Sequence, residues 1–192
     1  QIVVLPDGTL VNVMTLINNV KNAHKSRGYN VAILRSTDKG VSWSKEILVN
    51  NLLTVGITDP ETGEPIRSGD IIPDIAVDRN SGTLYVVWQD SRFSNGARDG
   101  IAFSKSTDGG LTWSAPVQIN KAPNVQAFTA SVEVAANGNI GVTYYDFRNN
   151  TSDPSTLPTD YWFLRSTDGG VTWNEEHVAG PFDMKTAPFA EG

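Results

Sequence analysis

The sequence has no cysteine, and its 192 residues include only 15 Lys and Arg against 21 Asp and Glu. The absence of cysteine excludes a disulfide framework, a Cys-ligated zinc or iron–sulfur site and a thiol nucleophile. A chain of this length buries roughly 70% of its unfolded surface and needs no such staple. The acidic balance, with no basic run, argues against nucleic acid as a partner, because phosphate neutralisation requires a concentrated positive surface.

Long apolar runs and metal-binding patterns are missing as well. No apolar run approaches the roughly 20 residues that span a bilayer, and no cleavable signal pattern opens the chain. The acidic stretch between residues 59 and 70 lacks an EF-hand pattern, and two His residues are too few and too far apart for a zinc site. We therefore expect no membrane span, no metal site and no cofactor. The start at Gln1, without Met, is typical of a processed or excised segment.

One pattern of eight residues occurs three times. The octamers STDKGVSW, STDGGLTW and STDGGVTW occupy residues 36–43, 106–113 and 166–173. Short runs rich in Val, Ile, Tyr and Trp recur in the same order around each octamer, separated by Asn-Gly and Asp-Gly turns, which indicates four strands per unit. In the second unit the first of these runs is residues 71–77. No segment sustains a helical apolar period, so little helix is expected.

Repeated four-stranded units with a motif in constant phase favour an all-β fold, a β-propeller, over a β-sandwich. We expect one partial propeller domain over residues 1–192. Its blades are predicted at about 1–56, 70–122 and 127–180, with 181–192 as the lead-in to a further blade. Propellers close with about four to eight blades. Three blades therefore predict either a piece of a longer parent chain, which is favoured, or a homodimer that completes a six-bladed ring.

The Asp of each octamer is predicted to stabilise a turn rather than to catalyse a reaction. A carboxylate at this position accepts hydrogen bonds from nearby backbone N–H groups, and the Gly after it adopts the left-handed conformation. The Trp folds back as an apolar plug. Three equivalent copies cannot all face one pocket, so we assign structural roles to Asp38, Trp43, Asp108, Trp113, Asp168 and Trp173.

Binding residues are expected on one rim only. In a propeller the short turns and the octamers lie on one rim, and the long connections at 18–29, 50–70, 89–100 and 146–160 lie on the other. Long loops on a rigid scaffold are where binding residues concentrate. Two of these loops open with an Asp-x-Arg pattern, Asp90 with Arg92 and Asp146 with Arg148. A salt bridge that shapes the loop is favoured over an Arg aimed at a ligand. The first unit has Asn18-Asn19 in this place.

The octamer S-T-D-x-G-x-[ST]-W resembles the Asp-box, or BNR repeat, of the sialidase superfamily, and all three copies match it. The resemblance implies a sialidase-like propeller, six-bladed in many members, that acts on or binds a glycan. It also implies an exported bacterial protein, extracellular or periplasmic. Asp-boxes occur in propellers without sialidase activity too, so the resemblance does not by itself imply that reaction.

The second unit resembles the blade of sialidases that carries an Arg-Ile-Pro motif, whose Arg grips the sugar carboxylate. Residues 70–74 are similar to this motif, but Ile71 stands where the Arg is expected. An Ile cannot bind a carboxylate as a guanidinium does, which argues against sialic acid. The position of the general acid, just before the third strand, is similar to that of Asp99, and Asp160 is taken as its equivalent in the third unit.

A glycosidase acid needs a raised pKa and a second carboxylate or its substitute. Asp74, Glu133, Asp146 and Tyr144 are open as partners of Asp99. The favoured prediction is a glycoside hydrolase with Asp99 and Asp74 as catalytic residues and with Arg92, Arg148, Asp146, Tyr144 and Asp160 binding the glycan. The alternatives are a non-catalytic glycan-binding propeller, which would use Phe93, Arg92, Tyr145, Arg148 and Trp162, and a protein-interaction propeller.

Overall fold

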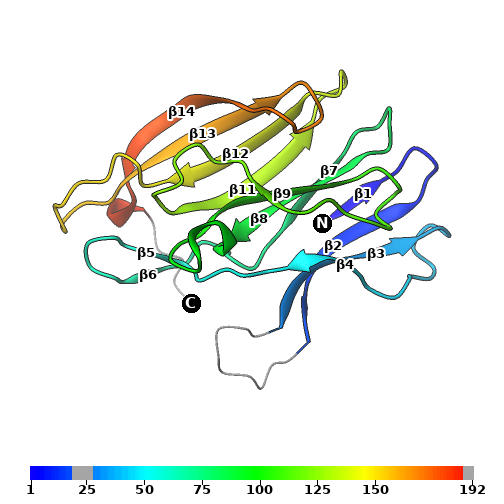
Figure 1. The fold of residues 1–192 in the computed structure, drawn as a ribbon, viewed down its shortest axis with the longest axis horizontal. Helices are drawn as coiled ribbons and strands as arrows, with labels where there is room; N and C mark the ends of the chain where they lie inside the picture. The colour runs from blue at the N-terminus through cyan, green and yellow to red at the C-terminus, as the bar shows by residue number, and fades with distance from the viewer. Residues whose placement is uncertain (19–27, 188–192) are drawn as a thin grey trace.

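The computed structural model describes residues 1–18 and 28–187, which form three four-stranded antiparallel sheets (Figure 1). In each sheet the strands pair in sequence order. The first sheet contains β1 (Ile2–Val4), β2 (Leu10–Ile17), β3 (Tyr29–Ser36) and β4 (Ile47–Asn51); the second contains β7 (Asp74–Val77), β8 (Leu84–Asp90), β9 (Gly100–Ser106) and β10 (Val117–Gln118); the third contains β11 (Ala127–Val134), β12 (Ile140–Asp146), β13 (Pro158–Ser166) and β14 (Asn174–Asp183).

The prediction of four strands per unit and little helix is confirmed. Among the described residues the only helical elements are two 3₁₀ turns, η1 (Arg92–Ser94) and η2 (Met184–Thr186). No helix in this part of the chain is long and apolar enough to cross a membrane. Residues 19–27 of the predicted loop at 18–29 lie outside the described residues.

Two predicted strand boundaries are wrong. The strand expected at 71–77 begins at Asp74, because the N–H of Ile72 closes a turn onto the carbonyl of Gly69 at 2.8 Å and Pro73 has no N–H to donate. The third sheet does not end at about residue 180, because β14 continues to Asp183 alongside the first residues of β13. The predicted lead-in at 181–192 therefore starts inside a strand, and its residues 188–192 lie outside the described residues.

The sheets pack face to face around their first strands, β1, β7 and β11, which lie side by side near the centre of Figure 1. One core forms between the first and second sheets, where Val13 and Ile33 meet Val86 and Trp88. A second core, which includes Phe103, forms between the second and third sheets. Burying each such side chain contributes about 1.5–3 kcal/mol. The alternation of β-strand side chains supplies an apolar face to each joint.

The strand register aligns the three sheets residue by residue, because the second strand of each sheet begins opposite the first residue of its octamer. This register corrects two equivalences drawn from the sequence. Asp160 pairs with Asp146 as Gly100 pairs with Asp90, so Thr159, not Asp160, is the equivalent of Asp99. In the first sheet the positions of the Asp-x-Arg pattern fall on Leu16 and Asn18, and not on Asn18-Asn19.

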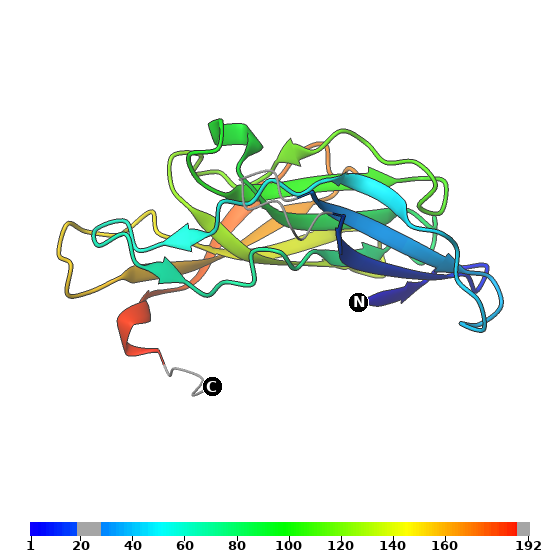
Figure 2. The same ribbon diagram turned by 90° about the horizontal axis from the view of Figure 1, so that it is seen from below.

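The connection between the first and second sheets contains a hairpin that the sequence did not reveal, β5 (Ile57–Thr58) and β6 (Pro65–Ile66). Ile57 packs in a small cluster with Phe128, Phe147 and Leu157 of the third unit. In Figures 1 and 2 the hairpin lies at the same end of the molecule as the loop between β12 and β13. The hairpin thus connects the long loop at 50–70 to the third unit on the long-loop rim.

Candidate functional site

The octamer carboxylates accept hydrogen bonds from groups of their own turns. In the second octamer, Oδ1 of Asp108 accepts hydrogen bonds from the backbone N–H groups of Leu111 at 3.0 Å and Thr112 at 2.9 Å, and Oδ2 accepts one from the Thr112 hydroxyl at 2.6 Å. The Thr112 hydroxyl, then the Thr112 N–H, lowers the pKa of Asp108 to about 2. Asp168 makes the equivalent three bonds, and Asp38 accepts the two from the N–H and the hydroxyl of Ser42.

The octamer Trp side chains differ in burial. Trp113 and Trp173 are partly buried against the two cores, and Nε1 of Trp113 donates to the carbonyl of Gly110 at 3.1 Å. Trp43 is 37% exposed. The Trp side chains therefore fold back over their turns, most completely where a preceding sheet lies against them.

Both Asp-x-Arg pairs form internal ion pairs. Nε of Arg92 lies 2.8 Å from Oδ1 of Asp90, and its Nη1 donates to Oδ1 of Asn50 on β4 at 2.8 Å. Arg148 donates to Oδ2 of Asp146 at 2.7 Å. These guanidinium groups connect strands and sheets, as the favoured interpretation of the pattern predicts.

Arg148 also lies at the centre of a wider network. It donates to Oε2 of Glu175 at 2.7 Å and its guanidinium lies 3.5 Å from the centre of the Trp162 ring. The buried Tyr144 donates its hydroxyl to Glu175, which in turn accepts from the N–H of Lys121 in the second unit at 3.3 Å. Four residues predicted to bind substrate, Arg92, Arg148, Asp146 and Tyr144, are thus engaged with the protein itself.

Asp160 and Asp74 belong to two further networks. Asp160 is fully buried and bonds Nε2 of His177 at 2.8 Å and Nδ2 of Asn149 at 2.9 Å. Oδ2 of Asp74 accepts from the hydroxyl of Ser131 at 2.7 Å and from the N–H of Val132 at 2.9 Å, which joins β7 to β11. The structure brings neither carboxylate together with Asp99.

Asp99 lies on the long-loop rim with its side chain fully buried. Oδ2 accepts from the hydroxyl of Thr54 at 2.6 Å and from Nε2 of Gln89 at 3.3 Å, and Oδ1 accepts from the N–H of Val55 at 3.0 Å. Burial raises the pKa of Asp99 to about 6, with a smaller contribution from the negative charge of Asp70. We call Asp99, Thr54, Asp70 and Gln89 the Asp99 cluster.

The hydroxyl of Thr54 joins the two carboxyl groups of this cluster. Oγ1 lies 2.6 Å from Oδ2 of Asp99 and 3.1 Å from Oδ2 of Asp70. A hydroxyl has a single proton to donate, so both contacts are hydrogen bonds only if one carboxyl group is itself protonated. Because burial raises the pKa of Asp99 to about 6, Asp99 is the group that carries this proton when the pH falls below that value, and its contact with Thr54 then reverses direction. Thr54 and Asp70 lie in the long connection at 50–70, and only its length and acidity pointed to them.

A strained residue borders the Asp99 cluster. Thr129 has a φ of 51°, which is unusual for a β-branched residue, and it lies at the irregularity in the pairing of β11 with β12. Its N–H donates to Oε1 of Gln89 at 3.0 Å, and its hydroxyl donates to the carbonyl of Ser68 at 2.9 Å. Such strain concentrates at functional sites. This geometry singles out the rim around Asp99 as the candidate site.

A cavity of about 500 Å³ opens on the same rim. Val55, which bonds Asp99, and Arg98, its neighbour in sequence, both line it. Three residues with amide side chains also line it, Asn124, Gln126 and Asn150. We call this cavity the rim pocket. Within it the amide of Gln126 bonds the backbone of Thr58, and Nε of Arg98 donates to the carbonyl of Pro123 at 3.2 Å.

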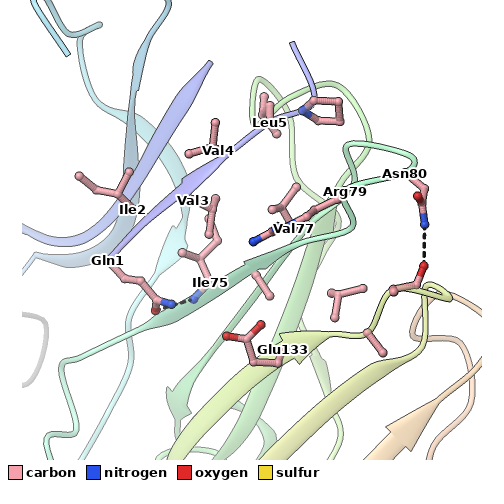
Figure 3. A pocket seen from close by; sticks show the side chains of 15 residues that line it. Gln1, Ile2, Val3, Val4, Leu5, Ile75, Val77, Arg79, Asn80 and Glu133 are labelled. Atoms are coloured by element: carbon pink, nitrogen blue, oxygen red, sulfur yellow. Dashed lines mark hydrogen bonds between the residues drawn. The ribbon is translucent and has the colours of Figure 1, made fainter. Parts of the chain in front are cut away.

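A larger groove of about 910 Å³ runs along the first strands β1, β7 and β11 (Figure 3). Its walls are mostly apolar, with Arg79 and Glu133 among the residues that line it. Glu133, one of the partners considered for Asp99, therefore lines this groove and not the Asp99 cluster. Within residues 1–18 and 28–187, no group of three or more His, Asp and Glu side chains is arranged to hold a metal ion.

No family model matches the sequence. Over 159 residues the chain is 30% identical to xyloglucanase Xgh74A of Acetivibrio thermocellus, an alignment that covers 74% of this chain and 16% of that protein. The structure is similar to a Hadza microbial sialidase, with a TM-score of 0.61, 20% identity and coverage of 93% of this chain and 37% of the sialidase. It is also similar to α-L-arabinanase of Penicillium chrysogenum, with a TM-score of 0.54, 18% identity and coverage of 95% and 50%.

The fold is therefore a sialidase-like β-propeller, as the sequence predicted, and it is an architecture found in glycoside hydrolases. The chain spans 16% of the length of the curated relative it matches and 37% of the sialidase.

Proposed function

We propose that this chain is part of a glycan-acting propeller of the glycoside hydrolase type, with Asp99 as its proton donor. The observation that carries the proposal is the buried carboxyl group of Asp99, with a pKa of about 6, that shares the Thr54 hydroxyl with Asp70. A general acid needs a pKa near the working pH, and glycoside hydrolysis uses two carboxyl groups. The hydrolase fold of the sialidase and the arabinanase supports the same class.

The half-buried Asp70 replaces Asp74 as the second carboxylate in this proposal, because Asp74 is already bonded to Ser131 and Val132. The proton of Asp99 passes to Oγ1 of Thr54, whose own proton passes to Asp70 and from there to the leaving glycosidic oxygen. Water attacks the anomeric carbon as its bond to the leaving oxygen breaks, and the proton that this water releases returns to Asp70 and through Thr54 to Asp99. Ile71 offers no cation for a sugar carboxylate, so the proposed substrate is a neutral glycan rather than a sialoside.

Hydrolysis of neutral polysaccharides such as xyloglucan and arabinan, measured beside a sialoside, tests this proposal. Asp99→Asn is expected to lower kcat at least about 100-fold, the range for loss of a general acid. Asp160→Asn is the matched control, since Asp160 is equally buried but lies in another network. Hydrolysis by Asp99→Asn at the rate of the unmodified protein would exclude Asp99 as the acid.

A second candidate function is glycan binding without turnover. The complete burial of Asp99 and the amide-lined rim pocket favour it. Arg98→Ala is then expected to weaken glycan binding at least about tenfold, while no product forms with any variant. Calorimetry together with product analysis separates this function from hydrolysis.

We further propose that the octamers are Asp-boxes and that the three sheets are blades of a larger ring in an extracellular or periplasmic protein. The repeated octamer turn supports the first point, and the uncovered faces of the first and third sheets support the second. The ring is completed by further blades of a parent chain or by a second copy. Light scattering of the chain distinguishes a closed dimer from an open monomer.

A further inference from the structure

The two joints between neighbouring sheets repeat one contact on the octamer rim. A Cβ atom added to Gly110 would lie 2.5 Å from Cδ1 of Ile33, and one added to Gly170 would lie 2.5 Å from Cζ of Phe103. Real Cβ atoms do not approach so closely. The fifth residue of the octamer is therefore Gly because the turn rests directly on the third strand of the preceding sheet. Ile33 and Phe103 hold the same position in their strands, three residues before the octamer.

The fourth residue of the octamer lies over a cation of the preceding sheet. A Cβ atom added to Gly109 would lie 3.2 Å from Nη2 of Arg35. In the next joint Nζ of Lys105 donates to the carbonyl of Gly169 at 2.9 Å. Arg35 and Lys105 each directly precede their own octamer. A long side chain at the fourth position would meet this cation.

The Asp-x-Arg pattern adds a second joint on the long-loop rim. Arg92 of the second sheet donates to Asn50 of the first at 2.8 Å. In the third sheet Arg148 holds Glu175, which bonds the N–H of Lys121 in the second unit. The second and third sheets therefore each contact the preceding sheet at both rims.

The outer face of the third sheet carries equivalents of the residues that the octamer turns contact in the first and second sheets. Phe163 holds the position of Ile33 and Phe103, and the exposed Arg165 holds that of Arg35 and Lys105. Among the described residues no further sheet covers this face.

The first sheet lacks the residues with which the second and third sheets contact the sheet before them. Its octamer has Lys39 as the fourth residue, with a φ of 60°, and Leu16 and Asn18 stand where the Asp-x-Arg pattern belongs. A second copy that placed its first sheet on the third sheet would set Lys39 against Arg165. Two positive charges would then meet at close range. In the first joint a Cβ atom added at this octamer position, Gly109, would already lie 3.2 Å from the guanidinium of Arg35.

We propose that the outer face of the third sheet is a docking surface for a further propeller blade that carries a Gly-Gly octamer and an Asp-x-Arg pair, and that this surface rejects the first sheet of a second copy. The proposal rests on the three sheets being blades of a larger ring, and it is independent of whether the ring hydrolyses a glycan. It deepens that part of the proposed function, because it specifies the chemistry of the next blade.

The experiment extends the full chain at its C-terminus, through a Gly/Ser linker, with a second copy of residues 123–183. This copy contains Gly169, Gly170, Asp146 and Arg148. The comparator receives residues 1–53, with Lys39 and without the pair. The first extension is expected to raise Tm and to slow hydrogen exchange in the original β13 at least about tenfold, while the comparator leaves both unchanged. Equal protection by the two extensions, or by neither, would overturn the proposal.

A matched variant keeps the result interpretable. Gly169→Lys confined to the added copy places Lys where the first sheet has Lys39, and it is expected to remove the slowing of exchange in the original β13. Retained protection would contradict the role of the fourth octamer residue. Light scattering of the unmodified chain is a measurement that needs no extension. A stable dimer in which β13 is protected would show that a second copy does dock, and would overturn the proposal without bearing on hydrolysis.

Discussion

The two rims of this protein treat the same side chain in opposite ways. On the octamer rim Asp38 and Asp108 are exposed, yet hydrogen bonds from hydroxyl and N–H groups lower the pKa of each to about 2. On the long-loop rim Asp99 also accepts hydrogen bonds, but burial dominates and raises its pKa to about 6. Donors stabilise the charged form, whereas loss of water destabilises it. The comparison teaches that burial decides which Asp can hold a proton for chemistry.

The largest effect is expected from disrupting the contact between an octamer turn and the preceding sheet. Gly170→Ala places a methyl group within 2.5 Å of Phe103 at a φ of +84°, and we expect a loss of about 3 kcal/mol in urea unfolding. Gly8→Ala is the control, since Gly8 has a φ of +86° with nothing within 4 Å of the added Cβ, and only the backbone cost of about 1 kcal/mol remains. Equal losses would mean that the contact with Phe103 carries no cost.

The next effect concerns the raised pKa of Asp99. The folded state binds the Asp99 proton more tightly than the unfolded state, so this contribution to stability is present below pH 4 and is lost as the pH rises to about 6. Asn resembles the protonated acid and does not titrate. The stability of Asp99→Asn relative to the unmodified protein should therefore rise by about 2–3 kcal/mol between pH 4 and pH 7. A pH-independent difference would show that Asp99 does not titrate in this range.

Asp108 should behave in the opposite direction. Its pKa is lowered, so its contribution is present above pH 4 and is lost as the pH falls towards 2. Because the carboxylate is exposed to solvent, we expect Asp108→Asn to cost only about 1 kcal/mol at pH 7. The cost should vanish near pH 2. Thermal unfolding at both pH values measures this change, and a cost that grows on acidification would contradict it.

The smallest expected effect concerns an ion pair that stabilises the long-loop rim. Nζ of Lys185 lies 2.8 Å from Oδ2 of the buried Asp59, which links η2 to the β5–β6 hairpin. Lys185→Met should speed hydrogen exchange at residues 57–66 while it leaves the global free energy of unfolding nearly unchanged. Lys45→Met, in an exposed segment after the first octamer, is the control. Unchanged exchange in the hairpin would show that the apolar cluster alone holds it.

The sequence predicted the strands well and the site only in part. Hydrophobic alternation and turn residues are local signals, so the four strands of each unit were identified to within a few residues. Asp99 was also identified as a candidate, from its resemblance to the general-acid position of sialidases just before the third strand. Thr54 and Asp70 were not, because they come from a loop whose path depends on contacts with the other units.

The equivalence of Asp160 with Asp99 shows how such an inference fails. Both precede a third strand in the sequence, but the pairing of Asp146 with Asp160 places the latter one residue further along. A shift of one residue turns a side chain to the opposite face of a strand. Sequence spacing alone does not fix the register at that precision.

What the sequence by itself determined is the repeat: three octamers in constant phase, the turns they form and the strands between them, since each depends on residues close along the chain. Only the tertiary structure decided which carboxyl group is deprived of water, which Arg is already paired and which sheet faces remain open. Burial and charge pairing arise between segments distant in sequence, as between Thr54 and Asp99 or Arg92 and Asn50. Those contacts exist only once the sheets have packed.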